Sequence, residues 1–224
     1  MYNKVKLFII ECVDPMDLIN ERSEAKALEQ VCKIFGHKVA NLTAYSEEDL
    51  RKFCLYIASI DSDHGTSDDN MMPLCIHISA HGNKDGIEFG SDFLKWRDMF
   101  EAMKPIFTDM NDYDGDVFVS ISSCEAGNQG LDRLIADEWE HTGKIDPPLY
   151  IFTTSDAGGV RWDDAVVSWT VFYHRLANIR HFSKDNVQQV LDNIHQCIGN
   201  EITYFRWDKM RADYLYYNPK QDDE

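Results

Sequence analysis

Two residues of this sequence, His81 and Cys124, have the types and surroundings that nucleophilic catalysis requires. Each follows an apolar stretch, residues 74–80 and 116–123 respectively, and each precedes a turn that contains glycine. A thiolate is the reactive form of cysteine, and a nearby imidazole can favour it, orient it and give a proton to a leaving amine. The backbone N–H groups of Gly82 and Cys124, freed where their strands end, can stabilise an oxyanion. His81 and Cys124 are therefore a candidate catalytic pair.

The two residues can meet only if the strands before them are neighbours in one sheet, and the rest of the chain predicts such a sheet. Apolar or β-branched runs predict strands at residues 5–12, 38–42, 74–80, 116–123, 149–154 and 202–205. Helical spacing of apolar residues predicts helices at residues 23–35, 46–60, 91–103, 131–139, 166–176 and 187–198. The alternation predicts an α/β fold, a three-layer αβα sandwich with a mainly parallel sheet. Ligands bind beyond the carboxyl ends of such strands, where both residues lie.

The chain is predicted to form one domain. Its 224 residues are enough to bury a core without disulfide or metal support. No internal repeat, low-complexity stretch or linker interrupts residues 1–217, and residues 218–224 are predicted to be a flexible tail. The acidic residues 61–70 predict an exposed loop, and the sequence Asp-Gly at residues 85–86 predicts a hairpin turn into a short strand.

Composition argues against several classes of partner. A formal charge of -17 is unfavourable for nucleic-acid binding, which needs clustered Lys and Arg. The apolar run at residues 5–10 is too short to cross a membrane, and the acidic residues that follow it do not fit a signal peptide. Six scattered cysteines without a C-x-x-C pair argue against a disulfide framework. We therefore expect a cytoplasmic protein that binds neither nucleic acid nor membrane.

Candidate metal sites have less support in the sequence than the pair His81 and Cys124. Cys75, His77 and His81 share one face of a predicted strand, but residues two and four apart on a strand lack the tetrahedral arrangement that zinc requires. Residues 109–116 resemble an acidic calcium loop, yet no glycine occupies its sixth position. We expect no metal and no cofactor.

Other candidates for the base and the nucleophile are also weaker. His64 precedes a glycine but lies in a polar stretch with no apolar strand before it. Ser122 and Ser123 lack the Gly-x-Ser-x-Gly motif of a serine nucleophile. His81 and Cys124 remain the better pair.

The segments around His81 and Cys124 resemble the caspase-like (clan CD) cysteine peptidases. In that group an apolar strand ends in His-Gly and a later apolar strand ends in the catalytic cysteine, as in Ile-His-Ile-Ser-Ala-His-Gly at residues 76–82 and Val-Ser-Ile-Ser-Ser-Cys-Glu-Ala-Gly at residues 119–127. Within the clan the chain looks most like CHAT-type peptidases, whose cysteine is also followed by Glu, a small residue and Gly. The likeness covers roughly residues 5–179. The caspase signature Gln-Ala-Cys-x-Gly is absent.

This resemblance implies a cysteine endopeptidase that performs limited proteolysis of a protein or peptide substrate. It implies that His81 and Cys124 are catalytic and that the amides of Gly82 and Cys124 form the oxyanion hole. It also implies regulated activity in a microbial stress, antiviral defence or cell-death response, under an activating sensor protein or an upstream protease. The short connection between residues 139 and 149 leaves little room for a cleavable intersubunit loop, so we expect an uncleaved chain.

The resemblance places a wall of the pocket for the substrate's P1 side chain near residues 155–162. Trp162 is a candidate apolar wall, and Asp156, Arg161 and Asp163 are candidate charged contacts. An aspartate would favour a basic P1 residue and Arg161 an acidic one, so the sequence leaves the P1 preference open.

Two other functions stay open at this point. The first is a catalytically silent binding module of the same fold that docks a partner through acidic loops. The second is a non-peptide acyl-transfer enzyme that uses the same Cys-His pair. Intact His81 and Cys124 favour the peptidase over the silent module.

Overall fold

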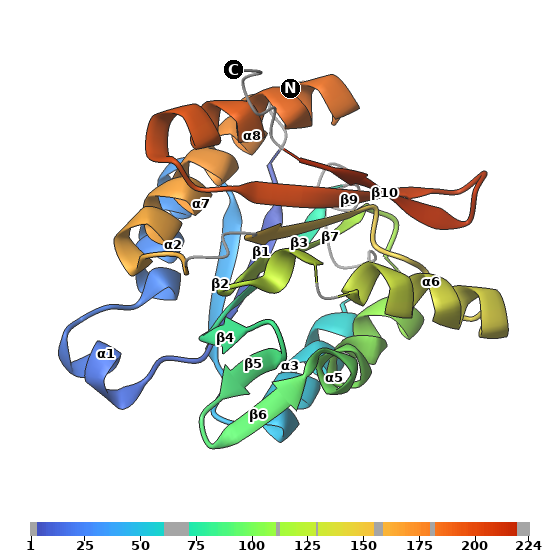
Figure 1. Cartoon of the computed structure of the whole chain (residues 1–224), viewed down its shortest axis with the longest axis horizontal. Coiled ribbons are helices and arrows are strands. Elements are labelled where there is room, and N and C mark those ends of the chain that lie inside the picture. The colour runs from blue at the N-terminus through green and yellow to red at the C-terminus, as the bar shows by residue number, and fades with distance from the viewer. Residues whose placement is uncertain are drawn as a thin grey trace.

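The computed structural model describes residues 4–60, 72–110, 113–128, 130–154, 159–179 and 182–218. A seven-stranded sheet runs through these residues in the order β10-β9-β8-β7-β3-β1-β2 (Figure 1). Five strands are parallel: β1 (Lys6–Glu11), β2 (Lys38–Thr43), β3 (Leu74–Ser79), β7 (Val117–Ser122) and β8 (Tyr150–Thr154). Two strands at one edge are antiparallel: β9 (Ile202–Asp208) and β10 (Asp213–Tyr217). The predicted mainly parallel sheet is confirmed.

Helices cover both faces of this sheet. One layer contains α2 (Glu24–Ile34), α7 (Trp162–Asn178) and α8 (Lys184–Ile198), and the other contains α3 (Glu47–Ala58), α5 (Trp96–Thr108) and α6 (Leu131–Thr142) (Figure 1). Alternate residues of β1 enter the two cores: Leu7 packs beneath the first layer and Ile10 beneath the second. This alternation is the period of a strand with both faces buried. The three-layer αβα sandwich predicted from the sequence is therefore confirmed.

Serine residues cap the starts of two helices, α2 and α3, close to the positions that the sequence predicted. The Ser23 hydroxyl accepts a hydrogen bond from the Lys26 N–H at 3.1 Å, and the Ser46 hydroxyl accepts one from the Asp49 N–H at 3.1 Å. Each serine thereby satisfies an N–H group that the first turn of a helix leaves unpaired. Ser46 is thus the N-cap of the helix that was predicted at residues 46–60.

A small antiparallel sheet follows β3 and corrects one prediction. It consists of β4 (Gly82–Asn83), β5 (Gly86–Phe89) and β6 (Asp92–Lys95), so the helix predicted from residue 91 begins only at Trp96. Ile87 pairs with Leu94, and both side chains are buried in the core. This pairing outweighs the local helical pattern, because burial of the two side chains depends on the strand register.

Several short elements had no sequence prediction. They are α1 (Pro15–Ile19), the 3-10 turn η1 (Ala126–Asn128) and β10. Helix α1 buries none of its residues, and it projects from the sandwich beside the ends of β1 and β2 (Figure 1). A helix with no buried face leaves no periodic apolar pattern to detect.

Some predicted segments lie outside the described residues. These are the acidic loop at residues 61–70 and all but the first residue of the predicted tail at residues 218–224. Within the described part of the chain, no helix combines the length and the apolar character needed to span a bilayer.

Candidate active site

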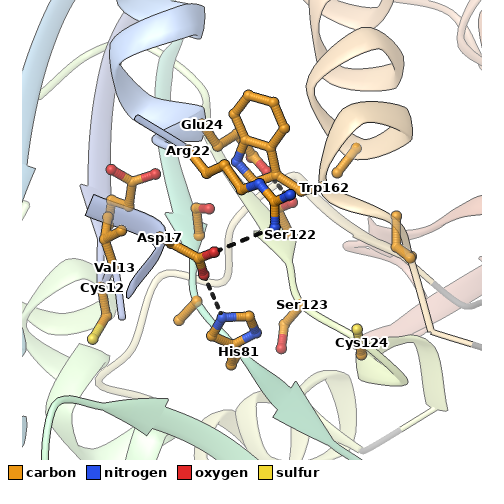
Figure 2. A pocket seen from close by; sticks show the side chains of 15 residues that line it. Cys12, Val13, Asp17, Arg22, Glu24, His81, Ser122, Ser123, Cys124 and Trp162 are labelled. Atoms are coloured by element: carbon orange, nitrogen blue, oxygen red, sulfur yellow. Dashed lines mark hydrogen bonds and ion pairs between the residues drawn. The ribbon is translucent and has the colours of Figure 1, made fainter. Parts of the chain in front are cut away.

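The pairing of β3 with β7 brings His81 and Cys124 to one rim of the sheet. The two strands are parallel neighbours, with Ser79 opposite Ser122. His81 and Cys124 each lie two positions beyond that pair. Both line a cavity of about 190 Å³ at the carboxyl ends of the strands (Figure 2). The neighbouring strands on which the candidate pair depends are thus present.

Close backbone contacts hold the two segments together. A Cβ atom at Gly82 would lie 2.9 Å from the Gly86 carbonyl oxygen and would also collide with the Ser123 hydroxyl, so a larger residue directly after His81 would displace its neighbours. The Glu125 carboxylate accepts a hydrogen bond from the Lys84 N–H at 3.0 Å, which links the turn after Cys124 to the β4–β5 hairpin. Glu125 itself has φ 56°, a left-handed conformation that is uncommon for a residue other than glycine. The amides assigned to the oxyanion hole, those of Gly82 and Cys124, therefore belong to adjoining segments.

A carboxylate that the sequence did not single out contacts His81. The Nε2 of His81 is 3.1 Å from the Oδ2 of Asp17, the geometry of an N–H donating to a carboxylate. Asp17 lies in α1 and is only 24% exposed, whereas the His81 side chain is 61% exposed. The second oxygen of Asp17 is 3.9 Å from the Arg22 guanidinium. Asp17 follows the carboxyl end of β1, at the same rim of the sheet as the candidate pair. That position in the sequence is the signal that could have identified it.

The orientation of His81 leaves one ring nitrogen available. Figure 2 shows the Nε2 directed at Asp17 and the other nitrogen on the side of Cys124. Among the described residues, no hydrogen bond joins His81 to Cys124. Catalytic hydrogen bonds are often long before substrate binds, so the arrangement is compatible with a Cys-His pair.

The loop after β8 approaches the Cys124 sulfur. Gly159 has φ +82°, and a Cβ atom built there would lie 3.8 Å from the sulfur of Cys124. The Thr154 hydroxyl accepts a hydrogen bond from the Ser123 N–H at 3.2 Å and donates one to the Ser123 carbonyl. The residue before the thiol is thereby held on both sides, while Cys124 itself is half-buried.

A buried polar network forms the floor of the cavity. The Oε1 of Glu24 is 2.7 Å from the Nε2 of His77, and its Oε2 accepts a hydrogen bond from the Ser122 hydroxyl at 2.9 Å. The Tyr173 hydroxyl is 2.9 Å from the Nδ1 of His77. Buried polar groups are stable only when paired in this way, so the network is structural.

A second carboxylate of the floor, Glu11, anchors the start of α2. It accepts hydrogen bonds from the Ser23 hydroxyl at 2.6 Å and from the Ala25 N–H at 3.0 Å. Burial raises the pKa of Glu11 above its ordinary value, against the opposing effect of these hydrogen bonds. The cavity lining is therefore rich in charged residues, namely Glu11, Asp17, Arg22 and Glu24.

Burial raises the pKa of four of the other cysteine thiols, those of Cys12, Cys32, Cys54 and Cys75. It raises the pKa of Cys32 and of Cys54 to about 12 and that of Cys75 to about 11. It also raises the pKa of Cys12, whose sulfur accepts a hydrogen bond from the Gly90 N–H at 3.0 Å. All six cysteines are free, and thiols with a raised pKa are poor nucleophiles at neutral pH.

The predicted substrate contacts divide into three groups. Trp162 lines the cavity. Arg161 and Asp163 are not among the residues that line this cavity; they lie on the exposed surface and pair with each other, with 2.7 Å between guanidinium and carboxylate. The role of all three in binding substrate stays a prediction. Asp156 lies outside the described residues.

The zinc ligands considered above have other partners. Cys75 and His77 both contact the Tyr173 hydroxyl in the buried network, and His81 contacts Asp17 at the rim. Within the described ranges, no group of three or more His, Cys, Asp or Glu residues is placed to hold a metal ion.

Comparison with known proteins supports the fold. No protein-family model matches the chain, and no curated protein matches its sequence. Among solved structures, caspase-1 from Spodoptera frugiperda is similar with a TM-score of 0.52 and 15% identity, over 87% of this chain and 77% of that chain. The narrower resemblance to CHAT-type peptidases stays a prediction. The strand order and this likeness together show that the chain has the caspase-like αβα fold.

Proposed function

We propose that this protein is a cysteine endopeptidase with His81 and Cys124 as its catalytic pair. One observation carries the proposal: the two residues line one cavity, at matching positions beyond the paired strands β3 and β7. The caspase-like fold supports it, because ligands of parallel αβα sheets bind at the carboxyl ends of the strands.

The proposed reaction begins with the thiolate of Cys124. It attacks the carbonyl carbon of the scissile peptide and forms a C–S bond, while the amides of Gly82 and Cys124 stabilise the oxyanion. The C–N bond then breaks as the His81 imidazolium gives its proton to the departing amine. In the second half, His81 takes a proton from water, whose oxygen attacks the thioester. The C–S bond breaks, and the acid product leaves with the thiolate restored.

Asp17 acts as a positioning residue in this scheme. Its carboxylate accepts a hydrogen bond from the Nε2–H of His81, which holds the ring so that the other nitrogen lies on the side of Cys124 (Figure 2). A carboxylate in this place also stabilises the imidazolium that forms when the thiol loses its proton. Arg22 in turn restrains Asp17 from the opposite side.

Regulation is part of the proposal. The sequence resemblance supports CHAT-like limited proteolysis in a cytoplasmic stress, defence or cell-death response, controlled by a sensor protein or an upstream protease. The exposed His81 side chain, which lacks a hydrogen bond to Cys124 in the described structure, favours a site that a partner or the substrate completes.

The test is intact-mass labelling with peptidyl acyloxymethyl ketones that differ at P1. The proteins are the wild type, Cys124→Ala and His81→Ala, all in a Cys197→Ser background that removes the exposed thiol. We expect one covalent adduct on Cys124 that depends on P1 and is lost in both variants. Labelling that persists in Cys124→Ala would contradict the proposal.

A catalytically silent binding module is the second candidate. The observation that favours it is that, within the described ranges, the hydrogen bond of His81 goes to Asp17 and none joins it to Cys124. Absence of labelling by every ketone, in the presence and absence of cell extract, would favour this module. Partner binding unaffected by Cys124→Ala would then support it.

A further inference from the structure

A second cavity lies on the other side of His81. Its volume is about 300 Å³, and it is enclosed by the loop after β1, helix α1, the loop after β2 and the β5–β6 turn. His81 lines both cavities, whereas Cys124 lines the first and not the second. We propose that the second cavity is the S1′ pocket, which receives an apolar side chain of the residue that follows the scissile bond. This inference rests on the proposed peptidase function.

The position of His81 determines which part of the substrate would enter this cavity. The acyl half of the substrate becomes bonded to the Cys124 sulfur, so it occupies the cavity that Cys124 lines. The amine half leaves with a proton from His81, so its nitrogen must lie beside the imidazole. The residue that carries this nitrogen, P1′, is therefore directed past His81 and into the cavity on its far side.

The chemistry of the walls favours an apolar side chain. The apolar and aromatic residues that line the cavity are Val13, Pro15, Leu18 and Tyr45, and Leu18 is still 40% exposed. A side chain that covers these groups removes apolar surface from water, which is worth about 25 cal/mol for each Å². The carboxyl groups in the lining come from Asp14 and Glu88, which disfavour an acidic P1′ residue by like-charge repulsion.

Contacts among the enclosing loops make the cavity pre-formed. The Gly90 N–H donates a hydrogen bond to the Cys12 sulfur at 3.0 Å, which joins the β5–β6 turn to the loop after β1. Gly90 has φ +62°, and a Cβ atom there would collide with the Tyr45 carbonyl, so the turn also meets the loop after β2. A pocket already shaped before binding loses less entropy when ligand enters.

Helix α1 supplies a matched control. Leu18 lines the second cavity, whereas the adjacent Ile19 does not and is 72% exposed. Neither side chain is buried, so replacing either with aspartate leaves the core intact. The variants Leu18→Asp and Ile19→Asp therefore add the same charge to the same helix, one inside the cavity and one outside it.

The experiment measures kcat/KM for fluorogenic peptides that share the P1 residue found by ketone labelling and differ only at P1′. We expect Leu or Phe at P1′ to exceed Asp by at least about tenfold, the range over which apolar pockets discriminate. Leu18→Asp should lower kcat/KM for the Leu peptide at least about fivefold relative to the Gly peptide, and Tyr45→Ser should act in the same direction. Ile19→Asp should change neither value.

A peptide aldehyde that ends at P1 separates this inference from the proposed function. It reaches Cys124 without entering the second cavity, so its inhibition constant should be the same in the wild type and Leu18→Asp. Equal kcat/KM for all P1′ residues, with the aldehyde still inhibiting, would overturn the S1′ pocket alone. Failure of both hydrolysis and aldehyde binding would overturn the peptidase proposal and the pocket with it.

Discussion

Two sets of one cysteine, one histidine and one carboxylate can be compared in the described part of the chain, and they differ chiefly in burial. The buried set is Cys75, His77 and Glu24. The rim set is Cys124, His81 and Asp17. Cys75 and His77 lie in β3, and His81 follows four residues after His77, just beyond the end of that strand.

Burial gives the two sets different chemistry. In the buried set His77 bonds to Glu24 and Tyr173, and burial raises the pKa of the Cys75 thiol to about 11. Every polar group there has a protein partner, so the set stabilises the core but cannot meet a substrate. In the rim set His81 and Cys124 face a cavity. The two sets therefore share their residue types, and they differ in whether a substrate can reach them.

The largest expected effect is the loss of activity when His81, the histidine of the rim set, is replaced. We expect His81→Ala to lower kcat/KM by about 10²- to 10⁴-fold, the usual contribution of a general acid-base residue. Its melting temperature should stay within experimental error, because the His81 side chain is 61% exposed. Peptide hydrolysis and thermal unfolding measure the two effects. A variant that retains full activity would remove His81 from the catalytic set.

Thiol reactivity provides the next test. At pH 8 a thiol with a pKa of about 11, such as Cys75, is thiolate in only about one molecule in a thousand. We expect iodoacetamide at pH 8 to modify Cys124 and the exposed Cys197, and to leave Cys32, Cys54 and Cys75 unmodified in the folded protein. Cys75 should react once denaturant unfolds the protein and makes its buried thiol accessible. Peptide mapping by mass spectrometry is the measurement, and equal modification of Cys75 and Cys124 at pH 8 would contradict the comparison.

The two carboxylates should differ in their effect on stability. Glu24→Ala removes the partner of the His77 Nε2 and of the Ser122 hydroxyl in the core, and we expect it to lower the free energy of unfolding by about 3–5 kcal/mol. Asp17→Ala removes a partly exposed contact and should cost about 0.5 kcal/mol. Urea denaturation of both variants gives the comparison. Similar losses would mean that burial does not separate the two sets.

The smallest expected effect is that of Asp17 on the rim histidine. Asp17→Asn keeps an oxygen near the Nε2 of His81 but removes the charge, and we expect kcat/KM to fall about tenfold. Urea denaturation of the same variant should show a loss of stability too small to account for this fall in activity, because the contact is partly exposed. A purely structural role would require the two losses to match. Asp17→Glu should restore part of the activity.

Several features of the molecule were predictable because their signals are local. The caps at Ser23 and Ser46 and the apolar periods of the helices depend on residues a few positions apart. The β-branched runs that end at His81 and Cys124 are local as well, and the alternation of strands and helices restricts the possible folds. The sequence therefore indicated the sandwich, the rim and the candidate pair.

Other features required the tertiary structure because they join distant residues. Asp17 meets His81 across 64 positions and Glu24 meets His77 across 53, and neither contact leaves a periodic pattern in the sequence. The strand β6 forms only because Leu94 pairs with Ile87 and is buried. By itself the sequence determined which residue types end the strands, since propensity and period act over short range. Burial, and hence which cysteine, histidine and carboxylate face the cavity, was decided only when the sheet and helices packed.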